Sequence, residues 1–333
     1  MKKSLLFFAM IAGMAIGNMA CSSSDDNGSS SDEPQFISAP ENADKAVQYT
    51  VAPEASTQMK QEATTEDGEA VAVQLNTVNF TESNKAVFGL TVQYSDKAKS
   101  KFETYNVEYN GNLYQVKDDS GKRLGTIEKV TAANARMTRA TDNVGLNINV
   151  EINVDGIKES VKFESEGAVT AQAVTNTVGS SATTTSLVRT WKVERLKLVL
   201  DFDDENKADA STVEKSGSLK PFVDLADKNN VKLSDNDRKN LNRTIADVTF
   251  AQTGLFTLNY TGSGSDAAKW KWADSAQKFI NLTLMDGEMG NKFIQDDSKV
   301  EVQWPGNGKC LLILSTRLED DACTATLQVM LKS

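Results

Sequence analysis

A regular alternation of apolar and polar positions marks the middle of the chain. From Val144 to Val154 every second residue is Val, Leu or Ile, and the residues between them are polar or glycine. A period of two predicts a β-strand with one buried face. Asp155-Gly156 follows directly and favours a tight type I′ turn, because both central residues of that turn need positive φ. Val161 and Phe163 then continue the apolar face on a return strand.

Similar β patterns precede this segment. Apolar alternation predicts strands around Val71–Phe80 and Ala86–Tyr94, and Asp119-Ser120-Gly121-Lys122 predicts a hairpin turn between residues 113–116 and 124–127. Residues 46–165 are therefore predicted to form an N-terminal β domain. Residues 166–186 are rich in Ala, Thr, Ser and Val, a composition that favours a linker, most clearly at Gly179-Ser180-Ser181.

Residues 187–333 are predicted to form a second β domain. Its first strand changes the phase of its apolar positions between Val193 and Leu196, which predicts a β-bulge and a sharp bend. Two short helices are expected next. One carries Phe222, Leu225 and Ala226, and the other starts with Ser234 and Asp237 in a capping-box-like pattern and continues through Leu241 and Ile245. Strands are then predicted at 248–250, 256–260, 268–272, 280–284, 300–304, 310–316 and 324–331.

The order of these elements predicts an all-β chain of two antiparallel β domains. Many short strands, each followed by its sequence neighbour, favour a meander that closes as a barrel in the second domain. Thr190-Trp191 opening the first long strand, the helical insertion at 219–246 and the final strands 311–314 and 327–330 resemble the lipocalin-like, or calycin-like, lipoproteins of Bacteroidetes. The resemblance covers roughly residues 187–333 and implies a lipocalin-like barrel with two short helices after its first strand.

The first residues carry a different pattern. A basic start at Lys2-Lys3 precedes an apolar run from Leu5 to Gly17, which is typical of a signal peptide over residues 1–20. Asn18-Met19-Ala20-Cys21 resembles a lipobox, which implies that Cys21 becomes the lipidated, palmitate-bearing N-terminus and attaches the chain to a membrane. Ser22–Asp26 resembles the Bacteroidetes export signal, which implies an outer-membrane anchor facing the cell exterior. Residues 21–45 are predicted to be a lipidated flexible tether.

Composition excludes several classes of function. The formal charge is −10 and becomes −12 once Lys2 and Lys3 are removed, so nucleic acid is not an expected partner. The chain has no His, which removes Ser-His-Asp triads and His-based zinc sites. No metal or cofactor is predicted. If residues 319–321 form a turn, Cys310 and Cys323 lie too far apart along their strands for a disulfide.

Trp191, Trp270, Trp272 and Trp304 all fall on predicted barrel strands. One interpretation is a cavity wall that stacks sugars or apolar ligands, with Trp270 and Trp272 on one face; the other is core packing. The acidic runs 201–206, 296–297 and 319–321 are interpreted as solvated loops rather than Ca²⁺ sites, because they lack the spacing of a calcium loop. Asp274-Ser275-Ala276 matches a Bacteroidetes O-glycosylation motif, which makes Ser275 a candidate for modification.

Three functions are consistent with these observations. The first is an outer-membrane surface lipoprotein that acts as a non-catalytic binding module for a glycan, a lipid or an envelope partner. The second is a structural accessory of an envelope nutrient-uptake complex. The third is a hydrolase with two carboxylates, which is the least favoured because no catalytic motif is recognisable.

Overall fold

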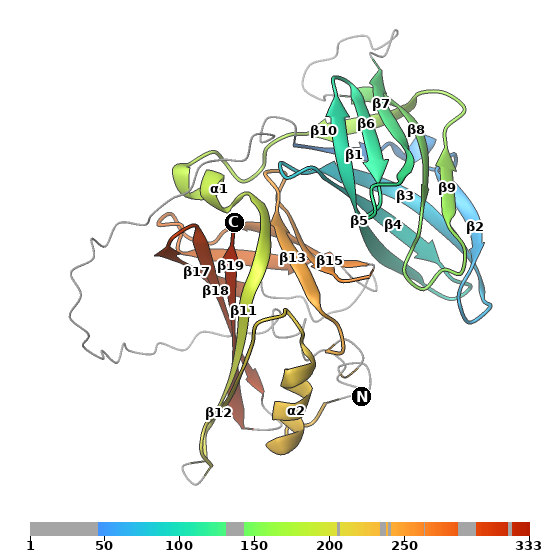
Figure 1. The fold of residues 1–333 in the computed structure, drawn as a ribbon. Coiled ribbons are helices and arrows are strands. Elements are labelled where there is room, and N and C mark those ends of the chain that lie inside the picture. The colour runs from blue at the N-terminus through green and yellow to red at the C-terminus, as the bar shows by residue number, and fades with distance from the viewer. Residues whose placement is uncertain are drawn as a thin grey trace.

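The computed structural model describes residues 46–130, 143–204, 207–233, 238, 241–262, 264–285, 298–318 and 322–333. The chain is all-β, as the alternation predicts, and its strands form two antiparallel barrels (Figure 1). The signal peptide, Cys21 and the tether lie outside the described residues. So do residues 205–206, 296–297 and 319–321, which belong to the three acidic runs.

The first barrel extends from residue 47 to residue 174. Its strands are β1 (Val47–Val51), β2 (Lys60–Thr64), β3 (Ala70–Phe80), β4 (Lys85–Gln93), β5 (Ala98–Asn110), β6 (Leu113–Lys117), β7 (Arg123–Val130), β8 (Asn143–Ile152), β9 (Val161–Glu164) and β10 (Val169–Val174), with a short 3-10 turn at Pro53–Ala55 between β1 and β2.

Strand pairing closes this barrel into a ring. β3 to β8 pair in sequence order, and β1 lies between β3 and β10, with Tyr49 opposite both Val78 and Ala173. β10 pairs in turn with β8. β1 and β2 pair with different parts of β3, so they share one strand position in the ring. β9 and β10 share one position beside β8 in the same way. The ring therefore has eight strand positions, a size at which side chains alone fill the interior; Phe80 and Phe163 are both fully buried there.

The segment predicted as a linker is only partly one. Residues 169–174 form β10, which pairs with β1 and β8 and so belongs to the first barrel. Alternation of Val169 and Ala171 toward the core with Thr170 and Gln172 toward solvent explains the strand. Residues 182–187 form α1 (Ala182–Leu187), whose first turn is capped by Ser181. The connection between the barrels is therefore shorter than residues 166–186.

The second barrel is the predicted meander. Its strands are β11 (Arg189–Phe202), β12 (Ala210–Glu214), β13 (Ile245–Phe250), β14 (Leu255–Tyr260), β15 (Ser265–Trp272), β16 (Phe279–Leu284), β17 (Ser298–Gly306), β18 (Lys309–Leu318) and β19 (Cys323–Lys332). β13 to β19 pair in sequence order. β11 closes the ring, because Trp191 lies opposite Val248 on β13 and Leu198 lies opposite Leu327 on β19. β12 forms a hairpin with the far half of β11.

The predicted bulge in the first strand of this barrel is confirmed. The register between β11 and β19 shifts between Val193 and Arg195. The shift turns both Glu194 and Arg195 away from the core, while Trp191 and Leu196 on either side stay buried.

One predicted helix is confirmed and the second is not fully described. α2 (Lys220–Lys228) buries Phe222 and Leu225 on one face, as their spacing indicates. Ser234 and Asp237 lie outside the described residues. Ile245 does not continue a helix: it opens β13 and pairs with Tyr260. No helix in the described ranges is long and apolar enough to cross a bilayer.

The turn at Asp155-Gly156 is wider than predicted. Ile152 pairs with Val161, so the whole of residues 153–160 connects β8 to β9. Ile157 is buried within this loop and forms an isolated bridge to Thr65, contacts that a two-residue turn would not allow. Gly156 does adopt the positive φ that its glycine suggests, at 78°.

The two remaining cysteines lie on neighbouring strands but at different levels. Cys310 is opposite Leu331, and Cys323 is opposite Leu318. Cys323 and Leu331 are about 27 Å apart at the rise of an extended strand, far beyond the roughly 7 Å between Cα atoms that a disulfide spans. The prediction that these two residues do not bridge each other is confirmed, and both are buried as small core groups.

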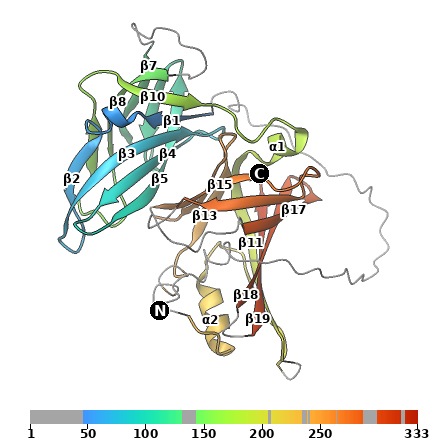
Figure 2. The same ribbon diagram turned by 180° about the vertical axis from the view of Figure 1, so that it is seen from behind.

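The two barrels pack side by side (Figure 2). A small apolar cluster joins Val87 and Phe102 of the first barrel to Ala251, Leu255 and Ala267 of the second. Backbone pairing also crosses the interface, between Phe102 of β5 and Ser265 of β15.

Polar side chains add hydrogen bonds around this cluster. Thr104 Oγ1 lies 2.6 Å from Ser265 Oγ, and Asn79 Nδ2 donates to Thr253 Oγ1 at 2.5 Å. The backbone N–H of Thr190 donates to Ser83 Oγ at 2.7 Å. The barrels therefore share a mixed apolar and polar interface.

Candidate functional site

The tryptophans predicted to line a cavity lie at the end of the second barrel that α1 approaches. Trp191 and Trp270 are buried, and each indole donates to a backbone carbonyl: Trp191 Nε1 to Leu187 at 2.8 Å, and Trp270 Nε1 to Ala251 at 2.9 Å. Buried rings with satisfied N–H groups are typical of core packing. The structure thus places these two residues in the barrel core.

The other two tryptophans are half-buried. Trp272 packs edge-on against Trp270 with ring centroids 5.9 Å apart, as expected for alternate residues on one face of β15. Trp304 lies 6.2 Å from Trp191. Trp272 Nε1 donates to Thr184 Oγ1 of α1 at 2.8 Å, and this hydrogen bond links α1 to the Trp270–Trp272 pair.

The outer wall of the same barrel carries a pocket that the sequence did not reveal. It has a volume of about 340 Å³ and is lined by Glu194, Arg195, Lys215, Lys309 and Met330. The β11 bulge supplies the first two, Lys215 directly follows β12, and the neighbouring β18 and β19 supply the others. We call this set of five residues the outer-wall pocket.

Three lysines form a row across the sheet at the edge of this pocket. Lys192 of β11 lies opposite Lys332 of β19, which lies opposite Lys309 of β18. Like charges directly opposite each other on neighbouring strands destabilise a sheet. Lys309 Nζ donates to Glu194 Oε1 at 2.9 Å and Lys192 Nζ lies 3.4 Å from Asp247 Oδ2, so two of the three charges are partly compensated.

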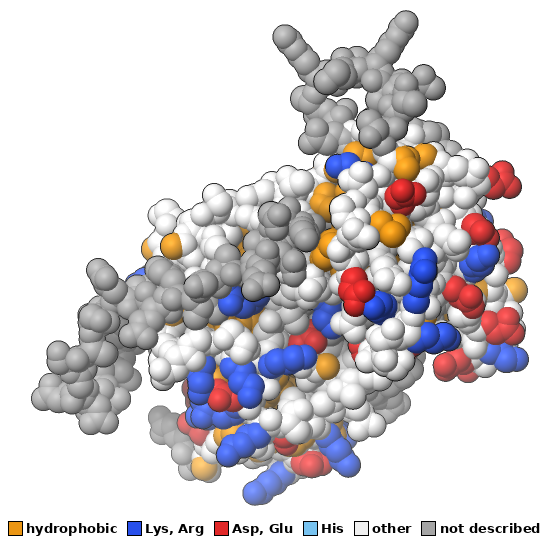
Figure 3. All heavy atoms as spheres, turned by 45° about the horizontal axis from the view of Figure 1, so that its top comes forward, with side chains coloured by type: hydrophobic (Ala, Val, Ile, Leu, Met, Phe, Trp, Pro, Cys, Tyr) orange, Lys and Arg blue, Asp and Glu red, His pale blue; other side chains and the backbone are white. Residues whose placement is uncertain are grey.

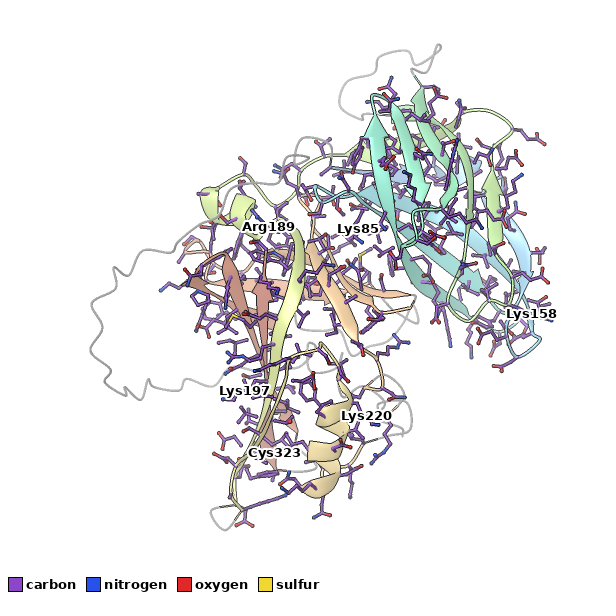
Figure 4. The ribbon with its side chains drawn as sticks, viewed as in Figure 1. Lys85, Lys158, Arg189, Lys197, Lys220 and Cys323 are labelled. Atoms are coloured by element: carbon purple, nitrogen blue, oxygen red, sulfur yellow. The ribbon has the colours of Figure 1, made fainter. Side chains whose placement is uncertain are left out.

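Positive charge dominates the lining of this pocket, on a chain that is acidic overall. The hydrogen bond from Lys309, with the nearby charges of Lys332 and Arg195, lowers the pKa of the Glu194 carboxyl, so it is ionised over the neutral range. Figure 3 shows Lys and Arg side chains gathered over the second barrel, at lower left, with fewer carboxylates between them. Lys197 projects from β11 on this side, farther from α1 than Arg189 (Figure 4).

Two buried glutamates lie where the barrels meet. Glu82 Oε1 accepts from the backbone N–H of Gln252 at 2.8 Å, and burial raises the pKa of its carboxyl to about 7. Glu103 Oε1 accepts from the backbone N–H of Asp155 at 2.6 Å and also from that of Gly264. Burial raises the pKa of Glu103 to about 7 as well, and these hydrogen bonds oppose the rise. Both carboxylates are engaged by backbone groups, which gives them a structural role.

No family model matches the chain, and no curated protein matches it. Two solved structures of the vaccine antigen Transferrin Binding Protein B from Haemophilus parasuis Hp5 show a distant similarity. A single mutant has a TM-score of 0.20 at 10% identity and covers 90% of this chain and 76% of its own. A double mutant has a TM-score of 0.21 at 10% identity and covers 86% and 74%. TM-scores of 0.20 and 0.21 do not indicate a shared fold or function.

The candidate modification site lies at the surface, and so do Asp201, Asp203 and Asp204, the described acidic residues of the first acidic run. Ser275 is exposed in the turn between β15 and β16, where Asp274 Oδ1 accepts the backbone N–H of Phe279 at 2.9 Å. Asp203 forms an ion pair with Arg317. Across the residues that the structure describes, no three acidic or thiol side chains gather as a metal site.

Proposed function

We propose that this chain is a surface lipoprotein of the Bacteroidetes type, anchored to the outer membrane through Cys21, whose two-barrel body binds a ligand without catalysing a reaction. The outer-wall pocket is the observation that carries the proposal. It is a concave site on a rigid barrel wall, where closed strand pairing holds the lining residues in place. Its volume lies in the range of small-ligand sites, about 300–1,000 Å³.

The sequence supports the surface location. The lipobox-like residues 18–21 and the acidic run after Cys21 are the basis for an anchored, outward-facing chain. The closed eight-strand meander of the second domain supports a lipocalin-like assignment, although here the tryptophans pack within the barrel or beneath α1. A glycan, a lipid or an envelope protein remains the proposed class of partner.

Two measurements test this proposal. Digestion of intact cells with a protease should remove the protein if it faces the exterior, and leave it intact if it faces inward. The mature lipoprotein, purified in detergent, should then bind at least one member of a panel of neutral and acidic glycans and lipid vesicles. Failure to bind any of them, with recovery of a stoichiometric envelope protein after cross-linking in cells, would favour the accessory role instead.

A further inference from the structure

We propose that the outer-wall pocket binds the oxyanion of a small, ring-sized organic acid, through Arg195, Lys215 and the lysine row. The anion is a carboxylate, sulfate or phosphate group. This inference rests on the proposed binding function and names the chemistry of its ligand.

The charges that line the pocket favour an anionic ligand. Of its four charged residues three are cations, and Lys332 stands beside them. The single carboxylate, Glu194, is already paired with Lys309. Within the described part of the chain, no ion pair is formed by Arg195, Lys215 or Lys332. A net positive pocket therefore persists on a chain whose formal charge is −10.

The arrangement of the lysines across the sheet also favours an anion. The row Lys192–Lys332–Lys309 sets like charges opposite each other on three adjacent strands. Glu194 and Asp247 compensate Lys309 and Lys192 in part, and the charge of Lys332 between them is left to oppose folding in the unliganded barrel. A local feature that opposes folding is expected where it serves binding. An anion above this row would relieve the repulsion, so folding and ligand binding should reinforce each other.

The shape of the site suits a ring that carries one oxyanion. The bulge places Glu194 and Arg195 side by side on the outer wall, and the ion pair with Lys309 neutralises Glu194. A guanidinium presents paired N–H groups that match the oxygens of a carboxylate, sulfate or phosphate. Met330 adds an apolar, polarisable surface suited to the face of a ring. The volume of about 340 Å³ suits one ring with its charged group.

The test compares four probes on the mature lipoprotein in detergent by calorimetry at low ionic strength. Glucuronate, glucose 6-sulfate and glucose 6-phosphate share a sugar ring and differ in the oxyanion, and neutral glucose is the control. At least one anionic probe should bind, and glucose should not. Binding should weaken as salt increases, because the charges of this exposed site are screened.

Variants locate the site. Arg195→Gln and Lys215→Gln should each weaken binding about tenfold, the size of one lost charge-assisted hydrogen bond. Arg195→Lys keeps the positive charge but loses the paired N–H donors of the guanidinium. Its affinity should lie between those of wild type and Arg195→Gln. Lys158→Gln removes the same charge from an exposed position on the first barrel (Figure 4) and should change affinity less than twofold.

The outcomes separate the two proposals. Equal weakening by Arg195→Gln and Lys158→Gln would mean that only net charge matters, which overturns the assigned site. Binding of a neutral glycan or a vesicle, with no binding of the three anions, would overturn this inference and leave the binding function standing. Absence of binding to every probe and to the whole panel would overturn both.

Discussion

Glu82 offers a sharp test of the barrel interface. Its side chain is fully buried and Oε1 accepts a hydrogen bond from the backbone N–H of Gln252 across the interface, while Oε2 has no donor among the described residues. A proton on the carboxyl would remove the buried negative charge, which burial disfavours. Glu82→Gln mimics that protonated state, because the amide keeps the accepting oxygen and adds N–H groups.

The magnitude follows from the pKa. Burial raises the pKa of Glu82 from 4.5 to about 7, and this difference corresponds to about 3 kcal/mol. Because the pKa is raised in the folded chain, the contribution of Glu82 to stability is fully present below pH 4.5. It is lost as the pH rises to about 7. The variant should therefore match wild type near pH 4.5 and exceed it by about 3 kcal/mol at pH 8.

The groups around Glu82 do not mask this effect. Tyr109, whose hydroxyl donates to the carbonyl of Thr81, is the titratable side chain that interacts with it electrostatically, and burial raises the pKa of Tyr109 further above the range of the test. Exposed carboxyls with lowered pKa values, such as Glu194 and Asp227, add stability as the pH rises. Wild type and Glu82→Gln both contain these carboxyls, so their contributions cancel in the difference between the two free energies of unfolding.

Urea unfolding of wild type, Glu82→Gln and the exposed control Glu62→Gln at pH 4.5 and pH 8 measures the effect. Glu62→Gln should differ little from wild type at either pH, since Glu62 lies on the exposed face of β2. If Glu82→Gln is equally destabilising at both pH values, the ionised carboxylate is the form that holds the interface, and the reasoning from burial fails.

Four further predictions concern single sites. Cys21→Ala should leave the precursor unprocessed and unlipidated, as intact mass will show. Ser275→Ala should lose any glycan mass that wild type carries; equal masses free of glycan would exclude the modification. Cys310 and Cys323 should not be recovered as a linked peptide in a non-reducing digest, because their strand levels differ. Trp270→Ala should lower the free energy of unfolding by about 3–5 kcal/mol, the cost of emptying a buried aromatic site.

The parts of the fold that depend on local pattern were predictable. Alternation over 144–154 marked β8, and the phase change at Val193 marked the bulge. The turn after β8 was not predictable, because residues distant in sequence contact it: the Glu103 carboxylate accepts the N–H of Asp155, and Ile157 forms a bridge to Thr65. A local dipeptide signal cannot report such a partner.

The outer-wall pocket could not be predicted either, because its residues come from strands that are distant in sequence. The bulge was visible in the sequence, but Lys309 and Met330 reach Glu194 and Arg195 only through the register of β18, β19 and β11. Lys215 directly follows β12, and the sequence predicted no strand there. For the tryptophans, spacing predicted that Trp270 and Trp272 share a face, but burial by α1 depends on a helix inside a segment expected to be a linker.

The pairing of β1 with β10 has a mechanical consequence for an anchored protein. The chain enters the first barrel at Val47 and leaves it at Val174, and these two ends are adjacent in the antiparallel pair. Tension between a lipid anchor and a bound second barrel would pull neighbouring ends apart and open the hydrogen bonds one after another. Shear would load them all together. When force is applied between the anchor and the second barrel, we expect the first barrel to unfold by separation of β1 from β10, starting at their adjacent ends. The contacts between the two barrels bear part of the same force.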